Sequence, residues 1–254
     1  MARAAVPGRL NGRLTWRVAR LVESWHETPT ARTMVFDVPG WPAHVAGQHV
    51  DVRLTAEDGY STQRSYSIAA PADGDRVELT VQRVTNGEAS PYLTEVLSTG
   101  DVVELRGPVG GWFVWHSTDT RPVLLVAGGS GIVPLMAMIR VRRAAGTLMP
   151  FRLVYSIRAP DERYYAAELR SLERAGDGLD VAYFYTRAAP EDWPRPPGRI
   201  GADDLIARGW RPDVEPSCFV CGPTGFVETV ANILIALGHD PRRIKTERFG
   251  PTGG

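Results

Sequence analysis

The chain has 254 residues, of which 43% are hydrophobic and 23% are charged, as in an ordinary folded protein. Lysine and arginine number 29, as do aspartate and glutamate, so no basic excess would attract nucleic acid. No unbroken apolar run approaches the roughly 18 to 20 residues of a membrane span. Residues 1–16 lack the apolar stretch of a secretory signal. We therefore expect a cytoplasmic protein without a membrane span.

The first half of the chain has the pattern of an antiparallel β-barrel. Short alternating runs are separated by turn pairs such as Asp-Gly and Asn-Gly, which favour hairpins. The expected strands are residues 33–38, 48–54, 63–69, 77–84 and 101–105. One helix is expected over residues 90–97. We assign residues 1–116 to this domain, because the pattern changes beyond them.

The second half, residues 117–254, alternates apolar strand-like runs with helical ones. The expected strands are residues 123–127, 151–156, 181–186, 218–221 and 243–249. The expected helices are residues 134–143, 162–174, 202–208 and 224–237. Such alternation predicts right-handed βαβ units and a parallel sheet covered by helices on both faces. The sequence thus predicts two domains, an arrangement that a chain of this length can accommodate.

The cysteine content excludes several kinds of site. Cys218 and Cys221 are the two cysteines of the chain, and they would point to opposite faces of a predicted strand. A disulfide framework needs more cysteines. A tetrahedral zinc site or an iron–sulfur cluster needs four ligands. The sequence therefore predicts no metal site and no cluster of its own.

The most specific segment is Arg64-Ser65-Tyr66-Ser67, which lies in a predicted strand. Alternation places Arg64 and Tyr66 on one face of that strand. There the guanidinium can pair with a pyrophosphate, and the phenol ring can lie against a flat heterocycle. Ser67 adds a small hydroxyl donor. Taken alone, the segment fits a solvated strand equally well.

A second phosphate contact is expected where the helix over residues 90–97 begins. In the segment Gly87-Glu88-Ala89-Ser90, we expect Ser90 to be the N-cap and Pro91 the first helical residue. A helix N-terminus is a site that attracts anions. The alternative interpretation is a capped helix without a ligand.

Two glycine-rich turns follow predicted parallel strands. The first is Gly128-Gly129-Ser130-Gly131, and the second is Cys221-Gly222-Pro223. Each turn links a strand to a helix, so both lie at the carboxyl edge of the sheet and form a crevice for a dinucleotide. Pro134 stands where the third glycine of the usual dinucleotide fingerprint belongs, so this phosphate loop is of a different kind. A buried strand cysteine is the simpler account of Cys221.

In this order the motifs resemble the ferredoxin–NADP reductase superfamily. The resemblance rests on Arg-x-Tyr-Ser, Gly-x-x-Ser, Gly-Pro-x-Gly, Gly-Gly-Ser-Gly-x-x-Pro and Cys-Gly-Pro, and it covers residues 14–249. It implies a six-stranded antiparallel β-barrel that holds FAD, followed by an α/β domain with a five-stranded parallel sheet that holds NAD(P)H. It also implies the activity of an NAD(P)H-dependent flavoprotein reductase.

The resemblance further implies roles for individual residues. Arg64 would bind the FAD pyrophosphate, Tyr66 would stack on the isoalloxazine ring, and Ser67 would hydrogen-bond near flavin N5. The other residues that match FAD-binding positions are Ser65, Val81, Gln82, Arg83, Ala89 and Ser90. The residues that match nucleotide-binding positions are Gly128, Gly129, Ser130, Gly131, Cys221, Gly222 and Pro223, with Ser130 between the two cofactors and Cys221 beside the nicotinamide.

Near the end of the chain, Glu247-Arg248-Phe249 resembles the family's Glu-x-aromatic ending, in which the aromatic ring covers the flavin. Here the chain continues beyond Phe249, so displacement of this ring by nicotinamide does not follow. We expect Ser67, Cys221 and Glu247 to tune position and polarity, because hydride transfer needs no covalent enzyme intermediate.

The electron acceptor is expected to be a separate protein, because FAD can release electrons singly and the chain has too few cysteines for a cluster. A [2Fe-2S] ferredoxin or an oxygenase component is the expected partner, in a system that feeds an oxygenase or a cytochrome P450. A flavin or ferric reductase is one alternative. A non-catalytic flavin or nucleotide sensor is another, since fold alone does not determine function.

The expected nucleotide is NADPH, with NADH as the alternative. Ser156, Arg158, Arg163 and Tyr165 follow the second parallel strand and can converge at the adenosine ribose. A 2′-phosphate needs such donors, whereas an NAD-selective site more often places a carboxylate there. The resemblance implies that the tyrosine stacks on adenine. Acidic residues at positions 161 and 162 leave open a second interpretation, in which the arginines form weak surface ion pairs.

Overall fold

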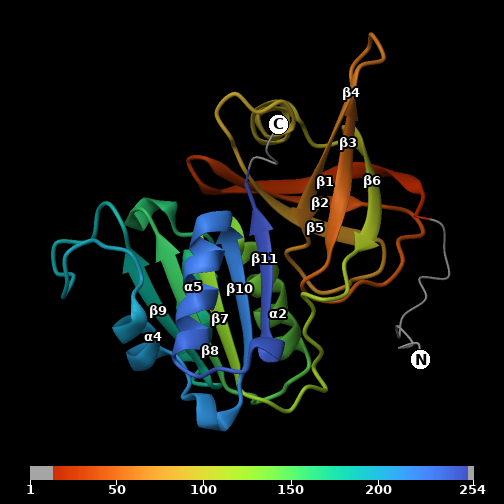
Figure 1. Ribbon diagram of the computed structural model, residues 1–254. Coiled ribbons are helices and arrows are strands. Elements are labelled where there is room, and N and C mark those ends of the chain that lie inside the picture. The colour runs from red at the N-terminus through yellow and green to blue at the C-terminus, as the bar shows by residue number, and fades with distance from the viewer. Residues whose placement is uncertain (1–13, 251–254) are drawn as a thin grey trace, which may run out of the picture.

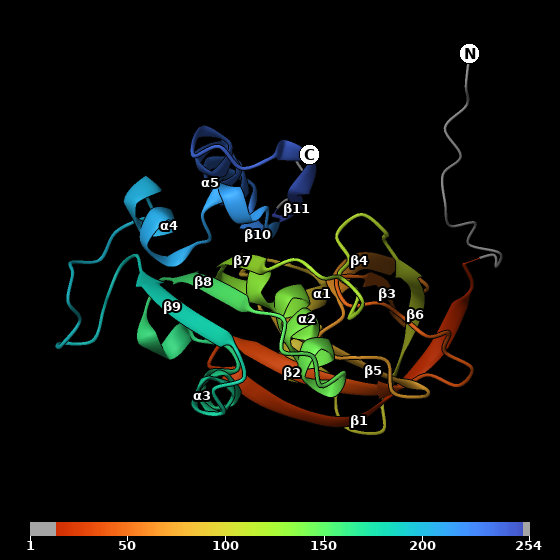
Figure 2. The same cartoon turned by 90° about the horizontal axis from the view of Figure 1, so that it is seen from below.

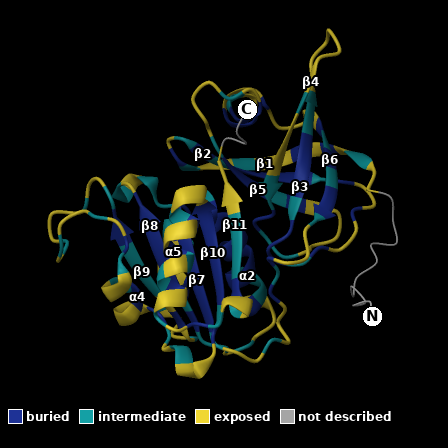
Figure 3. Ribbon diagram, viewed as in Figure 1, coloured by how far each residue is buried: buried dark blue, intermediate teal, exposed yellow. Residues whose placement is uncertain are grey.

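The computed structural model describes residues 14–250, which form two sheets lying side by side (Figure 1). The first sheet has six strands and the second has five. Both sheets have buried interiors, whereas the outer face of the last helix is exposed (Figure 3). Among residues 14–250, no helix combines the length and the apolar character that crossing a membrane requires.

The amino-terminal sheet is antiparallel and forms the predicted barrel. Its strands are β1 (Trp16–Thr28), β2 (Ala31–Asp37), β3 (His49–Thr55), β4 (Ser61–Ser67), β5 (Arg76–Gln82) and β6 (Val102–Val109). They are hydrogen-bonded in the order β4-β3-β6-β1-β2-β5. A bridge between Ile68 and Leu79 links the two edges of the sheet. Inward-facing side chains such as Phe36 and Leu105 are fully buried, as the alternating pattern requires.

Strand β1 is missed by the sequence pattern. Its pairing with β2 shifts register between Leu21 and Glu23, and again between His26 and Thr28. A β-bulge inserts an extra residue and breaks the period of two on which the prediction depends. The other five strands of the barrel overlap the predicted ones.

The predicted helix over residues 90–97 is divided into two short pieces, α1 (Ala89–Pro91) and a π-helical turn, Tyr92–Val96. The prediction that Ser90 is the N-cap is wrong, because α1 begins at Ala89, two residues before the predicted first helical residue, and its N-cap is Glu88. The Ser90 hydroxyl instead accepts a hydrogen bond from the Val84 backbone N–H at 3.0 Å. The serine therefore stabilises the preceding loop.

The carboxyl-terminal sheet is parallel, as predicted. Its strands are β7 (Val123–Gly128), β8 (Phe151–Ile157), β9 (Leu179–Tyr185), β10 (Ser217–Pro223) and β11 (Ile244–Phe249). The helices are α2 (Ile132–Ala144), α3 (Ala166–Arg174), α4 (Ala202–Arg208) and α5 (Thr224–Ala236). The strand order is β11-β10-β7-β8-β9. Helices α2 and α3 contribute to the apolar cluster that contains Cys221, whereas α4 and α5 contribute to the cluster that contains Cys218.

The helix predicted over residues 162–174 starts later than expected. Pro160–Glu162 form a 3-10 turn, and α3 begins at Ala166 after Tyr165, which adopts a left-handed φ of 54°. A bulky residue rarely adopts this conformation, so the sequence gives no local signal for the break.

The two domains share a packed interface. Strands β1, β2 and β5 of the barrel lie against α2 and α3 (Figure 2). Ala31 and Ala69 of the barrel half belong to the same apolar cluster as Leu135 and Leu169 of the α/β domain. The interface is therefore an extension of the core of the second domain.

Candidate active site

Strand β4 presents the Arg-x-Tyr-Ser residues as alternation predicts. Arg64 and Tyr66 pair with Val52 and Val50 of β3, so they share one side of the ladder and the two serines share the other. Tyr66 packs against the barrel core, and burial raises the pKa of its phenol to about 12. Tyr66 is therefore neutral at physiological pH.

The Arg64 side chain is 57% exposed. It donates to the Gln63 carbonyl at 2.7 Å, and its Nη2 lies 3.7 Å from a carboxylate oxygen of Glu88. Glu88 also accepts hydrogen bonds from the hydroxyls of Tyr60 and Thr62, each at 3.1 Å. Exposed ion pairs of this kind are weak, so an anionic ligand can replace Glu88 at Arg64. No sequence pattern indicated Glu88 as a partner of Arg64, although Glu88 lies inside the Gly-x-x-Ser motif.

The other residues matched to FAD positions occupy varied environments. Ser65 donates to Asp51 Oδ1 at 2.7 Å, within the barrel wall. The side chain of Val81 lies in the core, so the residue can offer a ligand its backbone alone. Arg83 pairs with Glu95 at 2.6 Å.

Ala89 and Ser90 are 2% and 6% exposed. The Ser90 hydroxyl is engaged by the preceding loop. Any phosphate contact at this turn would therefore use backbone N–H groups.

The two glycine-rich turns lie side by side at the centre of the parallel sheet. Strands β7 and β10 are neighbours, and the chain order reverses between them. In open α/β sheets, ligands bind at this switch point, outside the carboxyl ends of the strands. The crevice predicted from the sequence is therefore present as a juxtaposition of the two turns.

Three glycines allow this close approach. A Cβ at Gly131 would lie 2.1 Å from the Cys221 carbonyl oxygen, and a Cβ at Gly128 or Gly222 would lie 2.7 or 2.8 Å from the Phe226 ring. Gly129 differs, because it has a φ of +55° and a Cβ there would meet nothing within 4 Å. Packing between the turns thus requires three of the glycines, and turn conformation requires the fourth.

Residues from the two domains meet at the ends of β10 and β11. Cys221 and Glu247 are neighbours in the parallel ladder. His49 Nδ1 lies 4.0 Å from Glu247 Oε1, and His49 is paired with Ser67 across β3 and β4. The structure therefore brings the predicted Ser67, Cys221 and Glu247 into one neighbourhood. It adds His49, which no sequence motif singled out.

Burial controls the protonation of this cluster. Burial raises the pKa of Glu247 to about 7, and Glu247 Oε2 is buried without a hydrogen-bond partner among residues 14–250. Burial, and then the charge of Glu247, raise the pKa of the Cys221 thiol well above its usual value. Burial lowers the pKa of His49, and Asp51 opposes this. The thiol is therefore neutral, and it is unsuited to act as a nucleophile.

A cavity of about 170 Å³ lies between the turns and the barrel. The residues that line it are Gln82, Gly128, Gly129, Ser130, Ser156, Ile157, Arg158, Glu162, Thr186, Pro223, Phe226 and Phe249. The cavity thus combines both turns, the end of β8, and Phe249. It also includes Glu162, a carboxylate near the expected ribose site.

Two predicted nucleotide residues lie elsewhere. Arg163 donates from Nε to the Pro160 carbonyl at 3.0 Å and lies over the Tyr183 ring, outside the cavity lining. Tyr165 is 3% exposed, and its hydroxyl donates to Thr80 of the barrel at 2.6 Å. The prediction that Tyr165 stacks on adenine is therefore wrong, because the left-handed turn directs its ring into the domain interface.

The residues present fit an FAD and a dinucleotide. Arg64 is exposed and weakly paired, as a pyrophosphate ligand must be. A cleft of about 610 Å³ in the barrel is lined by Tyr60, Thr62 and Glu88, but by none of the residues matched to FAD positions. Glu247 lies beside His49 of the barrel, and its buried Oε2, which has no partner among the described residues, calls for a hydrogen-bonding group.

Comparison with known proteins agrees with this arrangement. Residues 19–114 match the family model of the oxidoreductase FAD-binding domain, and residues 125–232 match that of the oxidoreductase NAD-binding domain. A flavohemoprotein from Rhodopirellula baltica is 26% identical over 98% of this chain and 63% of its own length. The reductase subunit of a glycine betaine monooxygenase from Pseudomonas aeruginosa is 31% identical over 95% of this chain and 66% of its own.

A crystal structure of a cytochrome P450 reductase from Amycolatopsis matches with a TM-score of 0.81 and 26% identity, over 97% of this chain and 73% of that one. The chain spans less than two thirds of the length of the flavohemoprotein, at 63%. It belongs to the ferredoxin–NADP reductase superfamily, as an NAD(P)H-dependent flavoprotein oxidoreductase with an FAD-binding barrel and an NAD(P)-binding α/β domain.

Proposed function

We propose that this reductase takes hydride from NAD(P)H in the cytoplasm and passes electrons to a separate [2Fe-2S] ferredoxin or oxygenase component. The meeting of His49 and Ser67 from the barrel with Cys221 and Glu247 from the second domain supports the first step. Hydride transfer needs donor and acceptor within about 3 to 3.5 Å, in a site that excludes water. Bound FAD supplies the redox chemistry, since it accepts hydride and can release electrons singly.

The proposed roles follow from position. Arg64 holds the pyrophosphate, and the neutral ring of Tyr66 lies against the isoalloxazine. Ser67 donates near flavin N5, and Cys221 borders the nicotinamide as a neutral thiol. Phe249 is 37% exposed and lines the nucleotide cavity, which suits a ring that covers the flavin.

The proposed acceptor lies outside these two domains. Cys218 and Cys221 are both buried free thiols and belong to apolar clusters on opposite faces of the sheet. They cannot ligate a shared cluster in this arrangement. A monooxygenase reductase subunit and a cytochrome P450 reductase among the similar proteins support an oxygenase system. The flavohemoprotein relative supports a haem protein as the second candidate acceptor.

NADPH is the proposed donor, although fewer residues support this choice than the sequence indicated. Ser156 and Arg158 line the cavity and can bind a 2′-phosphate. Glu162 lines the same cavity and repels a phosphate, while it can accept hydrogen bonds from the ribose hydroxyls of NADH. The expected preference for NADPH is therefore modest.

The first experiment mixes the purified FAD-loaded protein with NADPH or NADH without oxygen and follows the flavin absorbance. We expect the flavin absorbance to decrease after mixing with either nucleotide, and to decrease faster with NADPH. Failure of both nucleotides to bleach the flavin would indicate a sensor and would contradict the reductase activity.

The second experiment compares acceptors at equal NADPH. The panel contains a [2Fe-2S] ferredoxin, a haem protein, free FMN and ferric citrate. We expect kcat/KM for the ferredoxin to exceed those for free flavin and ferric citrate by about tenfold or more, since protein docking adds binding energy. Fastest reduction of free flavin or ferric citrate would overturn the acceptor proposal, and fastest reduction of the haem protein would select the second candidate.

A further inference from the structure

Strand β5 turns three polar side chains, Glu78, Thr80 and Gln82, away from the barrel core. They alternate with apolar residues that are buried in that core. The nucleotide-binding domain covers this polar face. Each of the three residues contacts or borders a different part of that domain.

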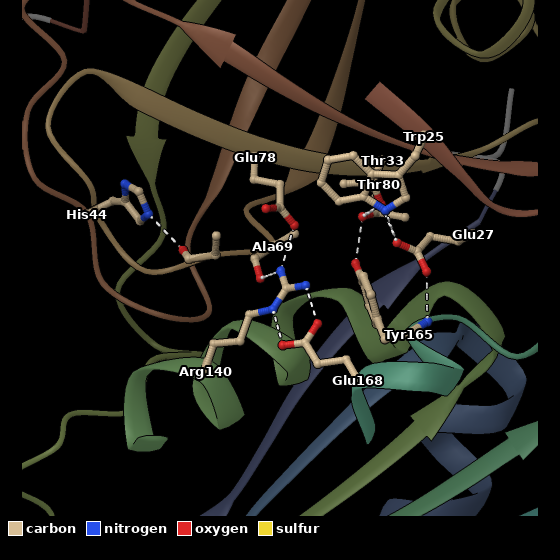
Figure 4. Close-up of polar contacts among 11 residues, drawn as sticks. Trp25, Glu27, Thr33, His44, Ala69, Glu78, Thr80, Arg140, Tyr165 and Glu168 are labelled. Carbon is tan, nitrogen blue, oxygen red and sulfur yellow. Dashed lines mark hydrogen bonds and ion pairs between the residues drawn. The ribbon is translucent and has the colours of Figure 1, made fainter. Parts of the chain in front are cut away.

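Arg140 of α2 binds Glu78, the first of these three residues. Its side chain is 16% exposed, and its Nη1 donates to Glu78 at 2.6 Å and to the Ala69 carbonyl at 3.0 Å. Its Nε and Nη2 donate to the two carboxylate oxygens of Glu168 in α3, at 3.0 and 2.6 Å (Figure 4). A bidentate pair fixes direction as well as distance. One guanidinium therefore ties α2 and α3 to β5.

Tyr165, at the start of α3, binds Thr80, the second of these three residues. Its hydroxyl donates to Thr80 at 2.6 Å, and its backbone N–H donates to Glu27 Oε2 at 2.9 Å (Figure 4). Glu27 Oε1 in turn accepts from the Thr33 hydroxyl at 2.9 Å. These contacts from β1, β2 and β5 hold Tyr165 in its left-handed conformation.

Both anchored helices are continuous with the nucleotide cavity. Helix α2 begins directly after the turn of Gly129–Gly131, which borders the cavity, and Tyr165 follows Glu162 by three residues. The third polar residue of β5, Gln82, lines the cavity itself. One barrel strand therefore contacts the cavity and the two helices behind it.

We propose that Arg140 and Tyr165 are positioning residues, which set the distance and angle between the NAD(P)H pocket and the flavin by fixing α2 and α3 to the polar face of β5. The proposal rests on the hydride transfer proposed above. Neither residue is among those proposed to touch the reacting atoms. A shift of about 1 Å between reactants can cost a hundredfold in rate, so contacts far from the chemistry can control it.

The test begins with Tyr165→Phe, which keeps the buried ring and removes the hydroxyl. In the FAD-loaded enzyme at saturating NAD(P)H, we expect the stopped-flow rate of flavin reduction to fall about fivefold to tenfold. The nucleotide Kd and the FAD content should stay within about twofold. A lower melting temperature with an unchanged limiting rate would show a structural role alone and would overturn the proposal.

Tyr164→Phe is the matched control. Tyr164 is adjacent and equally buried, at 2% exposed, and its hydroxyl has no hydrogen-bond partner among the described residues. We expect this variant to reduce flavin at the full rate. An equal loss of rate in Tyr164→Phe would overturn the specific role of the Tyr165 hydroxyl.

Two further variants test the same strand. Thr80→Val should slow reduction at least as much as Tyr165→Phe does, because it also removes the hydrogen bond between Thr33 and Thr80. The double variant should be no slower than Thr80→Val, because both substitutions remove the same hydrogen bond between Tyr165 and Thr80. Arg140→Lys keeps the charge without the bidentate fork and should retain more rate than Arg140→Met. Equal rates in Arg140→Lys, Arg140→Met and the unaltered enzyme would contradict a role for the guanidinium. If Arg140→Met does not fold, the comparison of Tyr165→Phe with Tyr164→Phe still tests the proposal.

Flavin reduction in the unaltered enzyme distinguishes a failure of the proposed function from a failure of the positioning role. If neither nucleotide reduces its flavin, the proposed function fails. If reduction is normal and Tyr165→Phe matches it, the function stands and the positioning role is wrong.

Discussion

The flavin side and the nucleotide side of this reductase are built in opposite ways. On the flavin side, Arg64 is 57% exposed and pairs with a carboxylate at the surface. On the nucleotide side, Gly131 and Gly222 have no room for a side chain, because Cys221 and Phe226 pack against them. A functional residue on the first side is free for a ligand. A glycine on the second side instead supports the packing of the turns that form the site.

The largest effect is expected from Gly131→Ala. The new Cβ would lie 2.1 Å from the Cys221 carbonyl oxygen, a backbone atom that cannot move without separating the two turns. We expect a loss of about 3 kcal/mol in the free energy of unfolding, measured with urea. Gly225→Ala is the control, because a Cβ there meets nothing within 4 Å. Unchanged stability in Gly131→Ala would remove the contrast between the two sides.

Arg64→Ala should separate ligand binding from folding. We expect a folded but largely colourless protein, since loss of about 2.7 kcal/mol from a charge-assisted phosphate contact lowers FAD affinity about a hundredfold. FAD content after gel filtration measures the effect. The control is Gln63→Ala, because Gln63 is exposed and adjacent to Arg64. We expect this variant to retain its FAD. Stoichiometric FAD in Arg64→Ala would contradict the pyrophosphate role.

Glu247→Gln tests the point where the two sides meet. Burial raises the folded-state pKa of Glu247 to about 7 from 4.5, so the folded protein holds this proton more tightly than the unfolded chain does. Ionisation therefore destabilises the folded state as the pH rises from about 4.5 to 7.

Thermal unfolding of both proteins across this pH range measures the difference. We expect the stability of Glu247→Gln relative to the unaltered protein to increase up to about pH 7 and then level off. A constant difference between pH 5 and pH 8 would show that the carboxylate is solvated.

The smallest effect is expected at Arg158, which lines the nucleotide cavity. Arg158→Ala should raise the KM for NADPH about fivefold, or about 1 kcal/mol, and leave that for NADH unchanged. Arg163→Ala is the matched control, because this side chain lies over Tyr183 and outside the cavity lining. Steady-state kinetics with both nucleotides measures this. An equal effect of the two substitutions would place both arginines at the surface and end the assignment of Arg158.

Both sheets and the order of the motifs could be predicted from the sequence alone. The alternation of apolar residues in β5 and the strand-to-helix turns at Gly128 and Cys221 are local features, and each predicts its own structure. The shared face of Arg64 and Tyr66 follows from a period of two in the same way. Local patterns failed at β1, where bulges break the period, and at α3, where a left-handed residue delays the helix.

The contacts between residues that are distant in the sequence depend on tertiary packing. Glu247 lies beside His49, and the Tyr165 backbone donates to Glu27, 138 residues earlier in the chain. Tyr165 therefore belongs to the domain interface, although its position after β8 favoured the adenine site. Glu88 at Arg64 is another such pairing. Contacts of this kind depend on how the strands, loops and domains pack, and the spacing of residues along one strand or helix carries no information about that packing.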